Sequence, residues 1–298
     1  MHLKWLLELV LLAAIWGSSF MFMRLSVVEL GAFPMTFTRT VIATLFLGTI
    51  LYFTRRKDMQ LIAKHWKLLV LIALSSTAVP FCLWSFVSYY LESGPMAVLN
   101  ATTPLFGALI AFVWLKEKLE SSAIIGLFLG FIGVCVLMIV PQSGVSLETL
   151  PVLVGLMATT CYGIAANLTR AKAKGLPPMA VATGSQLFSS LVLAPFALYT
   201  WPEAMPSSTA VWSTVVLGIA CTGFAFYMYF KMIAEQGITK TLSVTYLIPL
   251  FAILWGSLFL GEIIEFRTLL GGGFILLGVA FTTGYIRLGR KRLAETNC

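Results

Sequence analysis

The chain has 298 residues, of which 59% are hydrophobic and only 11% are charged, and its mean hydropathy is +0.94. Soluble domains carry about a quarter charged residues, so this composition excludes a water-soluble globular protein. The formal charge of +8 does not indicate a nucleic-acid partner, because the basic residues lie between long apolar runs, as in membrane proteins with basic cytoplasmic loops.

The apolar runs predict an all-α integral membrane protein with ten transmembrane helices. A membrane-spanning helix needs about 20 mostly apolar residues, because lipid offers no partner for unpaired backbone groups. The first run is expected to stay in the protein as a helix, because it is long and has no signal-peptide cleavage site. The ten predicted spans are 4–23, 34–54, 67–89, 95–115, 122–140, 150–169, 178–200, 210–231, 238–260 and 267–287.

The lysines and arginines in the short loops predict the orientation of the chain. With a cytoplasmic N-terminus, nearly all of the 20 basic residues face the cytoplasm. Only Arg24 and Arg267 fall on the opposite side, and Arg39 lies inside the second predicted span. The sequence therefore predicts a multi-pass protein in membrane lipid with both termini cytoplasmic.

A sequence repeat divides the chain into two related halves, 1–145 and 146–298. Each half contains five predicted spans, an odd number, so the second half crosses the membrane in the opposite sense. Inverted repeats of this kind provide two near-equivalent arrangements around a site near the membrane midplane. The repeat therefore predicts a carrier that works by alternating access. Three features recur at the same spacing: the sequence PLF at 104–106 and 249–251, a glutamate at 117 and 262, and a glycine at 126 and 271.

The repeated motif resembles the paired motif of EamA-type carriers in the drug/metabolite transporter superfamily. The resemblance rests on residues 104–119 and 249–264, and the stretch WGSSF at 16–20 and Arg39 are similar to the family's first-repeat signature. It implies a ten-helix secondary transporter that exports amino acids, aromatic ones among them, or other small metabolites across the bacterial inner membrane. Efflux of drugs or toxic cations, exchange of organic phosphates or nucleotide sugars, and a channel-like pore are the alternatives.

The sequence gives no sign of an enzyme, a metal site or a bound cofactor. It has no HExxH motif and no GxxxxGK[ST] phosphate loop, so transport driven by ATP hydrolysis within this chain is excluded. The five cysteines show no CxxC spacing and are interpreted as small hydrophobic residues. No acidic residue is placed at mid-bilayer, and Glu8 lies near a helix end, so facilitated diffusion is favoured over proton antiport.

Arg39 is the charged residue predicted inside a span, and its role is open. Three roles are considered: Arg39 attracts a substrate carboxylate, it braces its helix by bonding backbone carbonyls of a neighbour, or its side chain snorkels outward. Asn100 is a polar residue beside Pro104, which removes a backbone hydrogen bond, as Pro249 does in the second half. Asn100 and the Pro104 region are candidates for polar contacts to a zwitterionic cargo, and an interhelical hydrogen bond is the alternative.

Six aromatic residues within the spans are candidates for the wall of a substrate cavity. The repeat relates Trp16 to Tyr162 and Trp84 to Tyr227, which indicates equivalent places on opposite sides of a cavity. Aromatic faces accommodate apolar side chains or an ammonium group, and packing against the core or lipid is the alternative. The candidates are Trp16, Trp84, Tyr89, Tyr162, Tyr227 and Tyr246, with Ser19, Asn167 and Gln186 as weaker polar candidates.

Glu117 and Glu262 open the short links after the fourth and ninth predicted spans. Their role is expected to be architectural, with each carboxylate accepting hydrogen bonds from the free N–H groups of the following helix. Glycine-rich faces in the fifth and tenth spans allow close packing, either within one chain or between two. A monomer is expected, with a dimer as the alternative, and the expected partner is a small-molecule substrate such as an amino acid.

Overall fold

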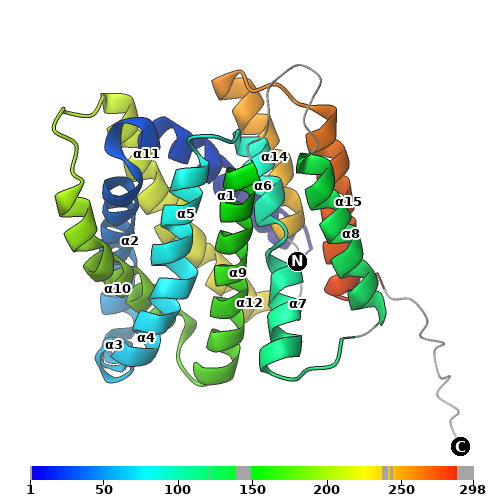
Figure 1. The fold of residues 1–298 in the computed structure, drawn as a ribbon. Coiled ribbons are helices and arrows are strands. Elements are labelled where there is room, and N and C mark those ends of the chain that lie inside the picture. Colours follow the sequence, from blue (N-terminus) through cyan, green and yellow to red (C-terminus); the bar gives the residue numbers. More distant parts are fainter. Residues whose placement is uncertain (1, 120, 139–148, 237–240, 242–243, 287–298) are drawn as a thin grey trace, which may run out of the picture.

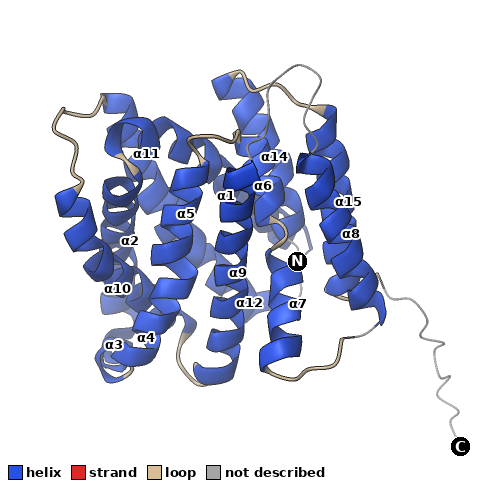
Figure 2. Cartoon of the chain, in the orientation of Figure 1, coloured by secondary structure: helices blue, strands red, loops and turns tan. Residues whose placement is uncertain are grey.

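The computed structural model describes residues 2–119, 121–138, 149–236, 241 and 244–286. Within these ranges the chain folds into helices joined by short links, and no strand occurs there (Figures 1 and 2). The predicted boundary between the halves at 145 and 146, the start of the ninth predicted span and the C-terminus at Cys298 lie outside the described residues.

The helices of each half follow one another in chain order (Figure 1). The first half contains α1 (His2–Leu30), α2 (Ala32–Arg55), the 3-10 turn η1 (Arg56–Asp58), α3 (Met59–Lys64), α4 (Trp66–Ala73), the π-helical segment η2 (Leu74–Ala78), α5 (Val79–Val87), α6 (Ser93–Asn100), α7 (Thr103–Trp114) and α8 (Ser121–Met138). The second half contains α9 (Thr149–Lys172), α10 (Pro178–Tyr199), α11 (Ser208–Gly218), the π-helical segment η3 (Ile219–Phe224), α12 (Ala225–Gln236), α14 (Val244–Leu260) and α15 (Phe266–Thr282).

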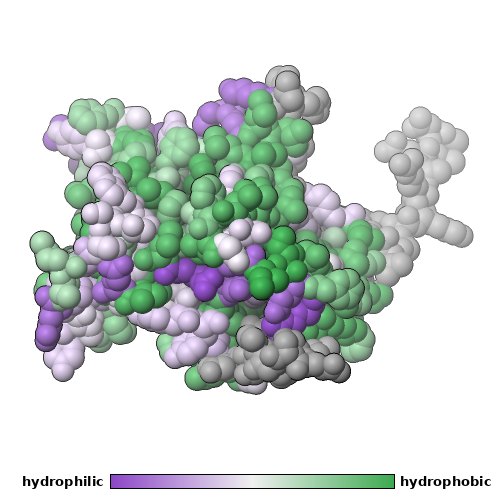
Figure 3. Space-filling view, turned by 90° about the horizontal axis from the view of Figure 1, so that it is seen from above, coloured by the Kyte–Doolittle hydropathy of each residue, from purple (hydrophilic) through white to green (hydrophobic). Residues whose placement is uncertain are grey.

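Seven helical stretches of the described chain are long and apolar enough to cross a membrane. Three shorter apolar helices, α8, α14 and α15, lie where the fifth, ninth and tenth spans are predicted. Large apolar side chains such as Phe53, Phe128 and Leu198 are exposed, which is unusual against water and normal against lipid. Seen from above in Figure 3, a band of hydrophilic residues crosses the end of the bundle, with hydrophobic residues on both sides of it. The chain is therefore an all-helical, multi-pass membrane protein, and the count of ten spans stays a prediction.

Three predicted spans depart from a regular α-helix. The fourth divides at residues 101–102 into α6 and α7, and Pro104 lies in the first turn of α7, where its missing N–H costs little. Pro249, by contrast, lies inside the unbroken helix α14. The third and eighth spans contain the π-helical segments η2 and η3, a conformation that is frequent at functional sites.

Helices α8 and α15 lie side by side and pack through glycines (Figure 1). A Cβ atom on Gly126 would lie 2.4 Å from the carbonyl oxygen of Gly278, and one on Gly133 would lie 2.7 Å from that of Gly271. Small residues allow backbones to approach this closely within a membrane. The glycine-rich faces therefore meet each other within this chain.

The first helix of each half packs onto a fourth-span helix of the other half. A Cβ atom on Gly17 of α1 would lie 2.7 Å from the Cβ atom of Phe251 in α14. In the same way, a Cβ atom on Gly163 of α9 would lie 3.1 Å from the carbonyl carbon of Phe106 in α7. The two halves therefore exchange equivalent contacts, because Gly163 and Phe251 stand at the positions of Gly17 and Phe106 in the sequence repeat.

Left-handed backbone recurs at matching places in the two halves. Gly31 and Gly175 follow α1 and α9, and their φ angles are 78° and 87°. Lys116 and Gly261 follow α7 and α14, with φ angles of 57° and 66°. A left-handed residue commonly ends a helix and turns the chain away from its axis. The first and fourth spans of each half therefore end in the same kind of turn.

Candidate functional site

Arg39 is a buried cation whose contacts are uncharged. It is 6% exposed, and its Nε atom donates to the hydroxyl of Thr222 in η3 at 2.7 Å. Its Nη1 atom lies 3.7 Å from the sulfur of Met23, and its guanidinium carbon lies 4.0 Å from the centre of the Phe81 ring. No carboxylate among the described residues forms an ion pair with it. A guanidinium in this setting favours binding of an anionic group.

An aromatic face of α5 lies beside this guanidinium. Phe81 and Trp84 are three residues apart, so they share one face of the helix. Trp84 is 2% exposed and packs edge-on against Phe20, with 5.9 Å between the ring centres. Its indole N–H has no hydrogen-bond partner within the described part of the chain. A buried donor without a partner costs free energy until a ligand or water accepts its bond.

Trp16 of α1 faces Tyr229 of α12 and not Tyr227. The Trp16 and Tyr229 rings lie 5.3 Å apart, whereas Tyr227 is 36% exposed on the outside of the bundle. Tyr227, which the sequence comparison relates to Trp84, therefore lies away from this ring contact, and its place in a cavity wall stays a prediction. A different spacing finds Tyr229: Thr222 follows Thr77 by 145 residues, both lie in π-helical segments, and the same spacing relates Trp84 to Tyr229.

The other predicted aromatic residues are divided between core and surface. Tyr89 is exposed, and its hydroxyl donates to a backbone carbonyl of α1 at 2.7 Å. Tyr246 shares a hydrogen bond with the hydroxyl of Thr283 at 2.8 Å. Tyr162 packs against the main hydrophobic core and is close enough to Arg39 to interact with it electrostatically. Tyr162 is thus placed with the buried cation, and Tyr89 and Tyr246 are not.

Two asparagines among the polar candidates make backbone contacts. The Nδ2 atom of Asn167 donates to the carbonyls of Gly107 in α7 and Gly163 in α9, both at 2.9 Å. Asn100 ends α6, and its carbonyl accepts a hydrogen bond from the Thr103 hydroxyl at 2.7 Å. In a regular helix the Asn100 carbonyl would accept a bond from the N–H of residue 104. Pro104 has no N–H, so the Thr103 hydroxyl takes its place. Asn167 therefore connects two helices of different halves.

Gln186 and Ser19 differ in how their polar atoms are used. Gln186 is fully buried between α10 and η2, where its Nε2 atom lies 3.4 Å from the hydroxyl of Thr77. Its Oε1 atom has no hydrogen-bond partner among the residues described. The Ser19 hydroxyl donates to the carbonyl of Trp16 at 2.6 Å, within its own helix. Gln186 therefore retains an unused acceptor, whereas the Ser19 hydroxyl is already engaged.

Glu262 joins the two halves at one end of the bundle. Its carboxylate forms an ion pair with Arg24 of α1, and it accepts bonds from the backbone N–H and the hydroxyl of Ser93 at 2.9 and 2.8 Å. Ser93 is the first residue of α6, whose free N–H groups need an acceptor. The sequence suggested the following helix, α15, as this partner. The carboxylate instead lies back over Gly256, which has no side chain to block it, and reaches α6.

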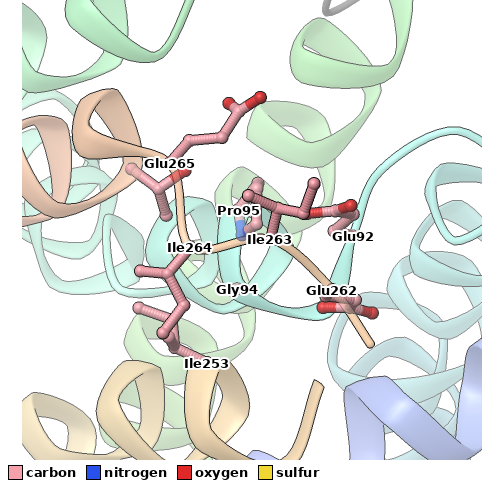
Figure 4. Close-up of a pocket in the computed structure, with 9 residues that line it drawn as sticks. Glu92, Gly94, Pro95, Ile253, Glu262, Ile263, Ile264 and Glu265 are labelled. Atoms are coloured by element: carbon pink, nitrogen blue, oxygen red, sulfur yellow. The ribbon is translucent and has the colours of Figure 1, made fainter. Parts of the chain in front are cut away.

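A pocket lies beside this ion pair (Figure 4). Figure 4 shows Glu92 and Glu262 on the same side of the pocket, with Gly94 and Pro95 beside them, whereas Glu265 points away. Burial raises the pKa of Glu92, and the negative charge of Glu262 raises that pKa further. Three glutamates therefore line the pocket, and the negative charges of Glu262 and Glu265 both raise the pKa of Glu92.

Glu117 occupies the matching position in the other half. It forms an ion pair with Arg170 of α9 at 2.7 Å, and both side chains are 51% exposed. Arg170 also donates to the Oδ1 atom of Asn167 at 3.2 Å. Figure 1 shows the link after α7, which carries Glu117, and the link after α14 at opposite ends of the bundle. Each end of the molecule therefore has a Glu–Arg contact between the halves.

Comparison with known proteins identifies the family. A sequence model of the EamA-like transporter family matches residues 3–139 and again residues 149–284. The chain belongs to the EamA-like transporter family. An uncharacterized transporter of Archaeoglobus fulgidus is 22% identical over 276 residues, which cover 93% of this chain and 97% of the relative. The uncharacterized transporter YoaV of Bacillus subtilis is 25% identical, with 94% and 97% covered.

A relative with a more specific name is a probable terminal-alkyne amino-acid exporter of Streptantibioticus cattleyicolor. It is 25% identical to this EamA-like chain, and the match covers 97% of the chain and 96% of the relative. A crystal structure of a further protein matches with a TM-score of 0.67 at 16% identity, over 95% of this chain and 97% of the other, which shows a shared fold. The family and the names of its members point to transport and not to catalysis.

Proposed function

We propose that this EamA-like protein is a secondary transporter that exports amino acids with apolar or aromatic side chains, and related small metabolites, across the bacterial inner membrane. The observation that carries the proposal is the buried guanidinium of Arg39, which has no carboxylate partner among the described residues. The carboxylate of an amino acid would supply the missing negative charge. The name of the probable amino-acid exporter from Streptantibioticus cattleyicolor supports the same class of cargo.

The surroundings of Arg39 suit the rest of such a molecule. The rings of Phe81 and Trp84 offer an apolar face, and the Trp84 indole N–H is an unused donor for a cargo oxygen. A phosphate-bearing cargo would call for several clustered basic residues. Arg24 and Lys231, two other basic residues with partly buried side chains, are already paired with glutamates near helix ends. These contacts favour a cargo with a single carboxylate.

We infer that residues 1–145 and 146–298 are two inverted five-helix repeats that rock against each other. The exchanged packing of α1 on α14 and α9 on α7 supports this, as do the matching left-handed turns. The bond from Arg39 in the first half to Thr222 in the second supports a site where the halves meet. Inverted repeats with a shared site give access from each side of the membrane in turn.

Orientation, assembly and energy source complete the proposal. With the basic loops in the cytoplasm, both termini and the Glu117 end of the bundle are cytoplasmic. The protein acts as a monomer, because the glycine-rich faces of α8 and α15 are used within the chain. The substrate gradient drives export by facilitated diffusion, because no acidic side chain is paired with Arg39 within the described residues.

The test is transport by the purified protein in proteoliposomes. A panel of labelled amino acids is offered, and saturable counterflow of apolar or aromatic members is expected, with no dependence on an imposed pH gradient. A single-channel conductance would contradict a carrier. Accumulation driven by a pH gradient, and lost in Glu8→Gln, would contradict facilitated diffusion.

Two substitutions separate binding by Arg39 from bracing. Arg39→Lys keeps the charge but loses the planar donor set of the guanidinium, so carboxylate affinity is expected to fall on the order of tenfold in a folded protein. Thr222→Val is the matched control, because it removes the bracing bond and leaves the charge in place. Affinity should then change little. Loss of folding in Arg39→Lys would favour bracing over substrate binding.

A further inference from the structure

We propose that two ion pairs exchanged between the halves, Arg24–Glu262 and Arg170–Glu117, are latches that open and close opposite ends of the transporter in turn. This inference rests on the proposed alternating access and names the side chains that would control it. Each latch joins one half to the other. A rocking motion of the halves must therefore change the surroundings of both pairs and separate one of them.

The two latches are equivalent in the sequence repeat. Glu262 follows Glu117 by 145 residues, the spacing that also relates the two PLF motifs. Arg170 follows Arg24 by 146 residues, the spacing that relates Gly17 to Gly163. In each case an arginine near the end of the first helix of one half meets the glutamate after the fourth span of the other half.

The two latches are unlike in their surroundings. The side chain of Glu262 is 7% exposed, and it also accepts two hydrogen bonds from Ser93 at the start of α6. Glu117 and Arg170 are each 51% exposed, so water surrounds their contact. A surface ion pair contributes little, whereas loss of one partner from a buried, hydrogen-bonded pair is costly. The Glu262 end is therefore the firmly held end in this structure.

The structure thus corresponds to one of two related states. In the other state the halves would rock so that Glu117 and Arg170 become enclosed, while Glu262 separates from Arg24 and Ser93. Because the two ends of the bundle carry one latch each, closing one end favours opening the other (Figure 1). A substitution that weakens one latch must shift the populations of the two states.

The experiment measures distances between spin labels at both ends of the full-length protein in lipid nanodiscs. One label pair replaces Tyr90 and Ile263, which are exposed on different halves at the Glu262 end. The second pair replaces the exposed Lys118 and Lys174, on different halves at the Glu117 end. The five native cysteines are first replaced by serine or alanine. No cargo is needed, so the result is independent of which molecule is transported.

Arg24→Gln is the main variant, because it breaks the ion pair and leaves the bonds from Ser93 to Glu262 in place. We expect the Tyr90–Ile263 distance to lengthen and the Lys118–Lys174 distance to shorten, with the ratio of the two populations changed on the order of tenfold. Glu262→Gln should act in the same direction. The double variant with Arg24→Glu and Glu262→Arg restores the ion pair but not the two bonds from Ser93, because a guanidinium has no acceptor, so the distribution should return only part of the way.

Glu265→Gln is the matched control. It breaks an ion pair with Arg267 at the same end of the molecule, but within one half, so both distance distributions should stay unchanged. Unchanged distances in Arg24→Gln and Glu262→Gln, or lengthening at both ends, would overturn the latch proposal. If one label distance lengthens and the other shortens, but no amino-acid counterflow is measured, the proposed cargo is contradicted and the latch proposal still stands.

Discussion

The side-chain amide of Asn167 in α9 donates to the backbone carbonyl of Gly107 in α7 at 2.9 Å, so one polar side chain connects the two halves within the membrane. The same amide bonds the carbonyl of Gly163 one turn earlier. Its carbonyl oxygen accepts a bond from Arg170. Every polar group of Asn167 is therefore engaged with the protein.

Replacement of Asn167 by leucine should destabilise the protein. The bond to Gly107 is lost, and interhelical hydrogen bonds in membranes contribute about 1 kcal/mol to the free energy of unfolding. Thr160→Val is the control, because the Thr160 hydroxyl bonds only within α9, to the carbonyl of Leu156. Unfolding in mixed micelles checks both. Equal stability of the two variants would show that the bond to Gly107 contributes nothing.

Alanine at Gly126 or Gly278 should disrupt the contact between α8 and α15. A Cβ atom on Gly126 would lie 2.4 Å from the Gly278 carbonyl oxygen, so the helices must move apart, at a cost of about 1–3 kcal/mol. Gly273→Ala is the matched change, since no atom lies within 4 Å of its Cβ position. Thermal unfolding in detergent should rank Gly273→Ala at or above the unchanged protein and the other two below it.

The left-handed turns predict opposite effects of glycine and alanine. Gly261 has a φ angle of 66°, so Gly261→Ala should cost about 1 kcal/mol of stability. Lys116 has a φ angle of 57° at the equivalent position, so Lys116→Gly should relieve a similar strain and raise stability. Gly107→Ala, in a helix with open space at its Cβ position, is the control. A stabilising Gly261→Ala would contradict this interpretation.

Glu92 should make stability depend on pH. Its folded-state pKa lies above its ordinary value of 4.5, because of burial and the nearby charge of Glu262. The folded protein therefore binds more protons than the unfolded chain between pH 4.5 and the raised pKa, and the free energy of unfolding falls as pH rises through that window. Glu92→Gln should flatten this fall, whereas Glu203→Gln, in an exposed link, should not. An unchanged pH profile in Glu92→Gln would contradict the coupling.

The helical positions follow from the sequence because lipid allows few solutions for an apolar run. A run of about 20 apolar residues must satisfy its own backbone groups, so it forms a helix wherever it occurs. The division of the fourth span at residues 101–102 was not predictable in the same way. Pro104 marks the region, but Pro249 stands at the related place in an unbroken α14, so the residue type alone does not decide.

The candidate site could be predicted only in part. Arg39 stood out because a charge inside an apolar run is rare, but its contacts with Thr222 and Phe81 depend on how distant helices pack. A two-residue difference in the alignment of the halves decides whether the repeat relates Trp84 to Tyr227 or to Tyr229. Which of these tyrosines contacts Trp16 depends on the side of α12 that faces α1. Likewise, Ser93 as the partner of Glu262 depends on contacts between the halves.

The packing of α1 on α14 bears on how the molecule is assembled during synthesis. Ala14 leaves the ribosome early, yet Trp255, whose indole N–H donates to the Ala14 carbonyl at 3.0 Å, is made 241 residues later. Until then the nascent α1 has neither this bond nor the partner for its glycine face. A chain that stops before α14 is inserted therefore leaves the Ala14 carbonyl and the surface of α1 around Gly17 without their partners.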